Sequence, residues 1–286
     1  MTKVEAQAPA KVNLTLHVTG RRPDGYHDLD SLVVFADISD RLTIGPAADL
    51  HLSVSGPFSS GVPTDERNSV LQAARLLRDT RGVRSGAAIS LEKHLPNAAG
   101  LGGGSSDAAA ALKALADFWS VDPLPAAAPE ILALGADVPV CLRAPHPTRM
   151  SGIGEVLTPV ADLPAFALVL VNPMVAVPTA AVFADLSSPD NAPMSAITPG
   201  MEFTGLTEWL SRQRNDLLPS ARAIAPEIDH AIARLKAMPR VAFAGMSGSG
   251  ATCFGVVASM ADARQVARAI QVSEMSWWVA PAEVLR

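Results

Sequence analysis

The stretch PNAAGLGGGSSDAAA, residues 96–110, places four glycines within five positions, directly before two serines, an aspartate and a run of alanines. Alanine favours helices, so the sequence predicts a helix over residues 105–119. A helix N-terminus carries unpaired backbone N–H groups and a partial positive charge, and glycines let an anion approach the backbone closely. The stretch therefore predicts a phosphate site at the start of a helix.

This glycine loop matches neither of the two common phosphate loops. No lysine follows the glycines, as a Walker A loop requires, and a dinucleotide fingerprint would need glycine where Ser105 stands. A glycine-rich turn with a serine cap is the structural alternative. A second cluster, GMSGSGATCFG at residues 245–255, lies between two predicted strands. Two such loops in one chain favour a cradle for a nucleoside triphosphate over two unrelated turns.

Strand-like and helix-like segments alternate along the rest of the chain. Alternating apolar residues predict a strand at 12–18. Further strand-like runs predict strands at 32–38, 40–44, 51–54, 87–93, 166–171, 240–244, 252–257 and 275–279. Helical periodicity predicts helices at 68–78, 105–119, 129–134, 179–186, 204–213, 226–238 and 262–270. The segment GADVPVCLRA, 135–144, is predicted as a turn followed by a strand. This order predicts an α+β fold with helices over one face of a mainly antiparallel sheet, divided into domains 1–155 and 156–286.

The composition excludes several classes of partner. The 286 residues are 49% hydrophobic and 18% charged, with a net charge of −5, so nothing indicates binding to nucleic acid or to an anionic membrane. The longest apolar run, near residues 165–177, is too short for a membrane span and contains Pro173. Cys141 and Cys253 are predicted to be buried thiols, which suits a reducing cytoplasm. The first 18 residues lack the apolar segment of a signal peptide, so a mature cytoplasmic chain is expected.

Three stretches, taken in order, resemble the GHMP kinase superfamily: PAKVNLTLHV (9–18), the glycine loop (96–110) and AGMSGSGATCFG (244–255). The segments RRPDGYHDLDSL (21–32) and LGADVPV (134–140) are similar to the branch that acts on 4-diphosphocytidyl-2-C-methyl-D-erythritol. The resemblance implies ATP-dependent phosphorylation of its 2-hydroxyl, in the non-mevalonate pathway of isoprenoid precursors. It also implies a two-lobed fold, with an N-terminal lobe like ribosomal protein S5 domain 2 and a ferredoxin-like C-terminal lobe.

The resemblance assigns catalytic and substrate-binding residues. It implies that Asp137 accepts the hydroxyl proton and that Lys11 is its cationic partner, although the residues alone also allow a turn cap and a solvated lysine. Tyr26 and Phe183 would stack on the two faces of cytosine, with His27 at the edge of the base. The full set of implied substrate-binding residues is Asn13, Tyr26, His27, Thr179, Phe183, Gly248 and Ser249.

The resemblance likewise assigns the nucleotide site. The residues themselves add two points. Asp107 would repel a nearby phosphate, so it is expected to point away from the anion. Lys93 is equally compatible with a charge at the end of a strand. Mg²⁺ is expected with ATP, with Ser105 or Ser106 able to contribute, and no protein metal ligand is assigned. The implied ATP-binding residues are Asn68, Lys93, Pro96, Gly100, Leu101, Gly102, Gly103, Gly104, Ser105 and Ser106.

Two other functions stay open at this point. The first is a related small-alcohol kinase of the mevalonate or homoserine type, which would need no cytidine-binding loop. The second is a nucleotide-binding regulator without catalysis, against which the presence of both Lys11 and Asp137 argues. A monomer or a weak homodimer is expected.

Overall fold

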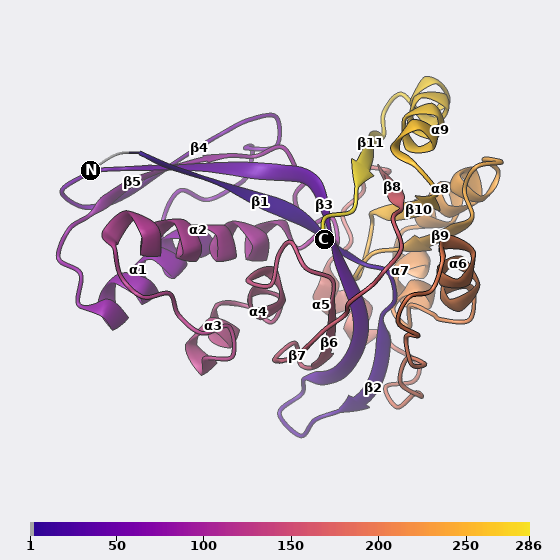
Figure 1. Ribbon diagram of the computed structural model, residues 1–286, viewed down its shortest axis with the longest axis horizontal. Coiled ribbons are helices and arrows are strands. Elements are labelled where there is room, and N and C mark those ends of the chain that lie inside the picture. Colours follow the sequence, from indigo (N-terminus) through magenta and orange to yellow (C-terminus); the bar gives the residue numbers. More distant parts are fainter. Residues whose placement is uncertain (1–2) are drawn as a thin grey trace. The chain divides into compact units, whose positions relative to one another are not determined.

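The computed structural model describes residues 3–286 (Figure 1). These residues divide into two compact units, each built from several separate stretches of the sequence. The expected α+β class is confirmed. The expected domains 1–155 and 156–286 follow the order of the chain and stay a prediction. Unit 1 contains the described residues up to Ala10, Ile38–Asn97 and Gly102–Ala144; unit 2 contains Lys11–Asp37, Ala98–Leu101 and Pro145–Arg286.

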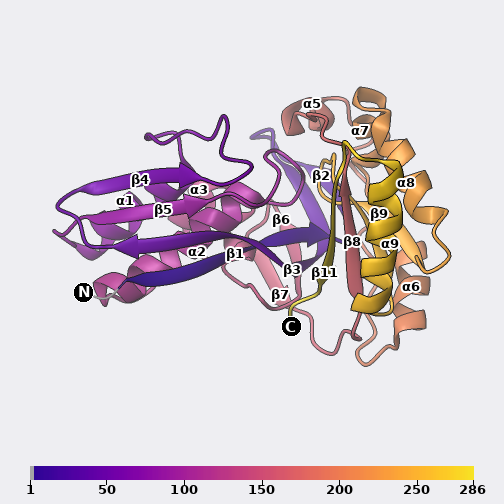
Figure 2. The ribbon, with the colours of Figure 1, turned by 90° about the horizontal axis from the view of Figure 1, so that it is seen from above.

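Unit 1 is a small sheet with helices on one face. Its central strand β5 (Ala87–Glu92) pairs in parallel with β4 (Leu50–Ser55) and antiparallel with the second part of β3 (His27–Gly45). Figures 1 and 2 show α1 (Ser69–Arg81) and α2 (Gly103–Trp119) lying side by side along one face of these strands. The alanines of α2 are buried, so this helix packs closely on its neighbours.

Local signals explain where the two helices of unit 1 begin. Asn68 caps α1, since its side chain accepts a hydrogen bond from the backbone N–H of Val70. Helix α2 begins at Gly103, two residues before the predicted start, because Gly102 adopts a left-handed φ of 62° that turns the chain into the helix. The glycine loop therefore extends into the helix itself.

The predicted strand within residues 135–144 is wrong. Val138–Cys141 forms the short helix α4, which follows α3 (Pro129–Leu134). All four residues of α4 are buried, so their apolar run carries no period that could separate helix from strand. Pro139 fits the first helical turn, where a missing backbone N–H costs no hydrogen bond.

Unit 2 contains a four-stranded antiparallel sheet in the order β11-β8-β10-β9. Numbered along the chain, this is the order 4-1-3-2 of a ferredoxin-like fold, as the resemblance implied. Figure 2 shows α8 and α9 on one side of this sheet. The bounds are β8 (Ala167–Asn172), β9 (Phe243–Met246), β10 (Cys253–Val257), β11 (Trp278–Glu283), α8 (Glu227–Lys236) and α9 (Met260–Ser273).

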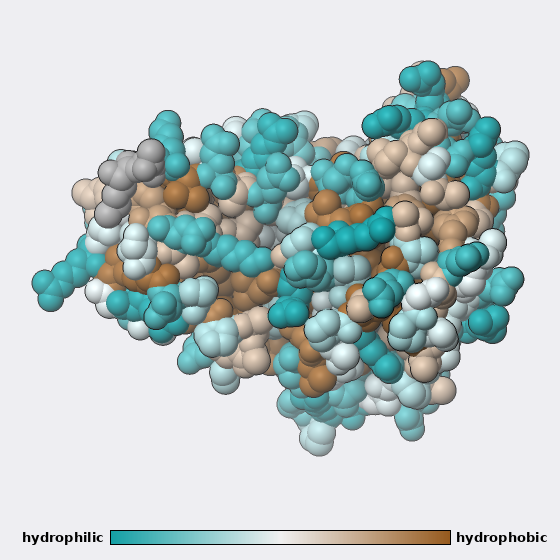
Figure 3. Space-filling model, in the orientation of Figure 1, coloured by the Kyte–Doolittle hydropathy of each residue, from teal (hydrophilic) through white to brown (hydrophobic). Residues whose placement is uncertain are grey.

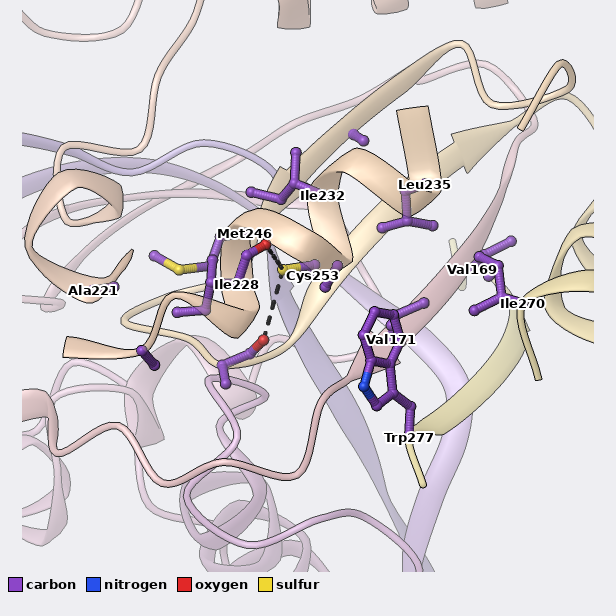
Figure 4. Close-up of a cluster of buried hydrophobic side chains, with 14 of the residues drawn as sticks. Val169, Val171, Ala221, Ile228, Ile232, Leu235, Met246, Cys253, Ile270 and Trp277 are labelled. Carbon is purple, nitrogen blue, oxygen red and sulfur yellow. Dashed lines mark hydrogen bonds between the residues drawn. The ribbon is translucent and has the colours of Figure 1, made fainter. Parts of the chain in front are cut away.

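The core of unit 2 lies between this sheet and its helices (Figure 4). Val169 and Val171 of β8 face Ile228 of α8 and Ile270 of α9 in this cluster. The Cys253 thiol lies within it and donates to the backbone oxygens of Ile228 and Ala251. Burial raises the pKa of Cys253, so this thiol stays protonated and serves as a small apolar core residue.

Other segments of unit 2 complete a second group of strands. The first part of β3 pairs antiparallel with β2 (His17–Arg21) and β6 (Thr148–Gly152), and β6 pairs with β7 (Val156–Pro159). The sequence did not predict β6, β7 or α7 as separate elements. The segment between β8 and β9 also contains the helices α5 (Thr179–Ala184), α6 (Phe203–Ser211) and α7 (Leu218–Ile224).

The surface agrees with the composition. On the face shown in Figure 3, hydrophobic residues form patches that are interspersed with hydrophilic ones. Within residues 3–286, no helix has the length and apolar character needed to cross a membrane.

Candidate active site

The glycine loop enters unit 1 at the start of α2. Gly102 is the N-cap residue, and the first hydrogen bond of the helix runs from the N–H of Ser106 to the oxygen of Gly102. Within the described chain no side chain caps this helix, and Gly104 is exposed. The backbone N–H groups of residues 103–105 are therefore available to an anion.

The two serines of the loop differ in their surroundings. Ser106 is buried, and its hydroxyl donates to the carbonyl oxygen of Pro9 at 2.7 Å. The hydroxyl of Ser69 in α1 donates to the carbonyl oxygen of Gly104 at 2.8 Å. Ser105 is partly exposed. The sequence analysis did not distinguish the two serines as partners of a phosphate or its metal ion. Their surroundings favour Ser105, because its side chain is accessible.

Lys93 lies in a buried group of charges. It is 3% exposed, and its ammonium group donates to Asp40 and, at 2.7 Å, to Asp107. The other oxygen of Asp40 accepts from the backbone N–H groups of His94 and Leu95 at 2.5 and 2.8 Å. As expected, Asp107 points into the interior. Burial raises its pKa to about 7 against the opposing effect of Lys93, and the charge of Asp40 adds to the rise.

Asn68 and Asp137 occupy helix starts in the same unit. Both groups of the Asn68 side chain are engaged, since its oxygen accepts from Val70 and its amide donates to the oxygen of Pro63 at 2.7 Å. Asp137 stands at the N-cap position of α4. A Cβ placed on Gly135 would lie 3.7 Å from the Ser105 hydroxyl, so the turn before Asp137 lies against the first turn of α2. The turn that precedes the predicted base therefore lies beside the glycine loop in space.

Unit 2 holds two of the residues expected to meet the acceptor hydroxyl. Lys11 and Asn13 lie at the end of β1 (Val4–Asn13), and both are buried. The Asn13 amide donates to the hydroxyl of Ser31 at 2.7 Å, but its carbonyl oxygen has no partner among residues 3–286 although Asn13 is only 1% exposed. A Cβ on Gly248 would lie 3.5 Å from this oxygen. The unpartnered acceptor therefore faces the third motif.

Ser247 joins all three motifs, and sequence reasoning missed it. Its hydroxyl accepts from the backbone N–H of Asn13 at 3.0 Å and donates to the carbonyl oxygen of Gly100 at 2.7 Å. Gly100 has a φ of 72°, and a Cβ there would collide with the carbonyl oxygen of Ser247. Asn215, also missed, donates to the oxygens of Met246 and Gly248. No local pattern marks either residue, because their partners are distant in sequence.

Aromatic and hydroxyl side chains of the predicted substrate group also meet in unit 2. The His27 ring stacks on Phe183 with 5.1 Å between the ring centroids, and Tyr26 beside it is 56% exposed. The hydroxyls of Thr179 and Ser249 are 2.7 Å apart, which ties the start of α5 to the third motif. Burial and the nearby charge of Arg21 lower the pKa of His27, so its ring is neutral at pH 7.

A salt-bridge network holds the loop that carries Tyr26. The Arg22 guanidinium donates to Asp28 at 2.8 Å and to Glu155 at 2.9 Å, and Glu155 also accepts from the N–H of Ile153 at 2.6 Å. The backbone N–H of Arg22 donates to the oxygen of Tyr26, which closes the turn. The segment 152–155 thus restrains the loop that carries Tyr26, although the two are far apart in sequence.

The predicted site residues fall into two groups. The structure brings Asn68, Lys93, Pro96, Gly102, Gly103, Gly104, Ser105, Ser106 and Asp137 into unit 1, and Lys11, Asn13, Tyr26, His27, Gly100, Leu101, Thr179, Phe183, Gly248 and Ser249 into unit 2. The pairing of Lys11 with Asp137 stays a prediction. So do the contacts of Asn68, Lys93 and Pro96 with the nucleotide.

Comparison with known proteins adds an independent line of evidence. Residues 68–144 match the model of the GHMP kinases N terminal domain, and residues 205–274 match that of the GHMP kinases C terminal domain. A 4-diphosphocytidyl-2-C-methyl-D-erythritol kinase of Dinoroseobacter shibae is 56% identical, over 98% of this chain and 94% of its own length. The kinase of that name from Paramagnetospirillum magneticum is 51% identical over the full length of both chains.

A solved structure agrees with these sequence relatives. The crystal structure of a 4-(cytidine 5'-diphospho)-2C-methyl-D-erythritol kinase is 33% identical, with a TM-score of 0.78, and the match covers 99% of each chain. The two-lobed fold that the resemblance implied is thereby confirmed. The chain belongs to the 4-diphosphocytidyl-2-C-methyl-D-erythritol kinase family of the GHMP kinases.

Proposed function

We propose that this chain transfers the γ-phosphoryl group of ATP to the 2-hydroxyl of 4-diphosphocytidyl-2-C-methyl-D-erythritol, in the non-mevalonate pathway. The observation that carries the proposal is the buried, unpartnered carbonyl oxygen of Asn13, on the same strand end as Lys11. Buried polar atoms require a hydrogen-bond partner, and a hydroxyl of the methylerythritol group supplies a donor. The names of the relatives support the choice of this polyol.

The nucleotide half of the site suits a triphosphate. The open N–H groups of residues 103–105, the left-handed Gly102 and the partly exposed Ser105 match what phosphate oxygens need. When bound with ATP, Mg²⁺ neutralises charge on the phosphate oxygens. Residues 3–286 contain no group of three His, Cys, Asp or Glu side chains placed to hold a metal ion. We therefore assign its coordination to phosphates and water, with Ser105 as the protein ligand.

The chemistry divides between two side chains. As the hydroxyl oxygen forms its bond to the γ-phosphorus and the bond to ADP breaks, the hydroxyl proton passes to Asp137. Lys11 stabilises the negative charge on the oxygen and the phosphoryl group during transfer. Both groups act through position and charge, which is where most of the catalysis of phosphoryl transfer lies.

The loop around Tyr26 provides the substrate specificity. Cytosine stacks between Tyr26 and Phe183, and His27 hydrogen-bonds the edge of the base. Thr179, Gly248 and Ser249 lie along the phosphates of the substrate. Mevalonate and homoserine have no base to fill such a site. We place the enzyme in the cytoplasm, as a monomer or a weak homodimer.

An assay of ADP release tests the function directly. Purified protein with Mg²⁺ and ATP is offered 4-diphosphocytidyl-2-C-methyl-D-erythritol, mevalonate or homoserine in parallel. We expect turnover with the cytidine substrate. Turnover restricted to mevalonate or homoserine would show that the substrate assignment is wrong.

A further inference from the structure

Three buried charged side chains lie beneath the first turn of α2. Lys93 comes from the end of β5, Asp40 from β3 and Asp107 from α2 itself, and none is more than 3% exposed. A Cβ placed on Gly103 would lie 3.5 Å from the Lys93 nitrogen and 3.9 Å from an oxygen of Asp40. This buried triad therefore touches the residue at which the phosphate-binding helix begins.

The triad is a costly arrangement for stability alone. Two carboxylates share one ammonium group, and burial of charged groups costs free energy that a well-packed apolar set would avoid. Asp40 is further satisfied by two backbone N–H groups, but the second oxygen of Asp107 has no partner in the described part of the chain. Asp107 thus depends on Lys93 for compensation of its charge.

The position of Asp107 shows what this compensation achieves. A carboxylate in the first turns of α2 would repel the phosphates that the helix start attracts, because both are negative. The 2.7 Å contact with Lys93 opposes that charge, and Asp40 holds the ammonium group in place from the other side. The same three side chains connect β3, the end of β5 and α2, which sets the position of the loop.

We propose that Lys93 and Asp40 are positioning residues for the phosphate loop, and that Lys93 supports ATP binding through Asp107 rather than by touching the nucleoside. The inference rests on the proposed ATP-dependent function. In place of a direct contact between Lys93 and the nucleoside, Lys93 acts by holding the loop and by opposing the charge of Asp107. The effect of Lys93 on ATP binding then depends on which residue stands at position 107.

A double-mutant cycle tests this dependence. The variants are Lys93→Met, Asp107→Asn and the combination of both. Lys113→Met in the same helix, alone and combined with Asp107→Asn, is the matched control. Calorimetry on the full chain measures the Kd of ATP and of inorganic triphosphate, which has phosphates but no nucleoside. Thermal unfolding of each variant is recorded beside the binding data.

The proposal makes four quantitative statements about this cycle. Measured at about pH 9, above the pKa of about 7 of Asp107, Lys93→Met should weaken ATP binding roughly tenfold or more, because the charge of this carboxylate near the phosphates is then left uncompensated. Inorganic triphosphate should lose affinity by the same factor. Adding Asp107→Asn should restore ATP binding to within about threefold of wild type, since the repelling charge is gone. Lys113→Met should have no such dependence on residue 107.

Other outcomes would overturn the proposal. If Lys93→Met weakens ATP but leaves inorganic triphosphate unchanged, Lys93 contacts the nucleoside directly. If the two substitutions are additive, Lys93 does not act through Asp107. Should Lys93→Met fail to fold, Asp107→Asn alone decides: we expect ATP binding within about threefold of wild type, and a tenfold loss would contradict the inference. Absence of ATP binding by the wild type would instead refute the proposed function.

Discussion

Ser247→Ala should have a large effect for the loss of a single oxygen atom. The hydroxyl accepts from the N–H of Asn13 at 3.0 Å and donates to the oxygen of Gly100 at 2.7 Å, and Ser247 itself is fully buried. Alanine leaves one donor and one acceptor without a partner, at about 1–3 kcal/mol for each. We expect the free energy of unfolding to fall by about 2–6 kcal/mol.

The matched control for this substitution is Ser220→Ala. Ser220 is also buried, but among the described residues 3–286 its hydroxyl makes a single hydrogen bond, to the oxygen of Asp185 at 2.9 Å. This variant should lose about 1 kcal/mol. Urea unfolding followed by circular dichroism measures both values under identical conditions.

The effect on kcat distinguishes the role of Ser247 from that of a buried serine elsewhere in the core. In the proposed function Asn13 lies at the acceptor site and Gly100 is the first glycine of the glycine loop. We therefore expect kcat to fall in folded Ser247→Ala protein while Ser220→Ala keeps normal turnover. Equal losses of stability and equal kcat values in the two variants would refute the reasoning. The assay is ADP release at saturating substrate, below the unfolding transition of both proteins.

Three further predictions concern the site and the triad. Asp137→Asn should lose most of kcat while the Kd of ATP stays within about threefold, and near-normal kcat would remove Asp137 as the base. Tyr26→Ala should raise the KM for the cytidine substrate roughly tenfold with little change in kcat, since the side chain is exposed and far from the reacting atoms in its proposed role; an unchanged KM would reject stacking. The pKa of Asp107 is raised to about 7 in the folded protein, above the unfolded value of 3.8. The unfolded carboxyl therefore ionises first, so the contribution of Asp107 to stability is complete below about pH 4 and declines as the pH rises to about 7. The free energy of unfolding, measured with urea at pH 5 and pH 8, should fall between these two values in wild type and not in Asp107→Asn. The same change in both proteins would contradict this prediction.

Much of the fold follows from local signals in the sequence. The alanine run after the glycines predicts α2, helical periodicity predicts α1, and the apolar runs at 166–171 and 252–257 predict two strands of the second sheet. These features depend on residues a few positions apart, whose preferences act within one turn or one strand. The kinase family could likewise be inferred from short motifs in a fixed order.

Tertiary packing decided the features that depend on distant residues. Val138–Cys141 became a helix because all four side chains are buried, which leaves no period in the sequence. Ser247 is 234 residues from Asn13 and 147 from Gly100, and Lys93 is 53 residues from Asp40. Hydrogen bonds over such separations form only when the fold brings their atoms within about 3 Å, and no local preference encodes that distance. The sequence by itself therefore determined the phosphate loop and the reaction class, whereas the groups that hold the loop in place emerged only from the folded chain.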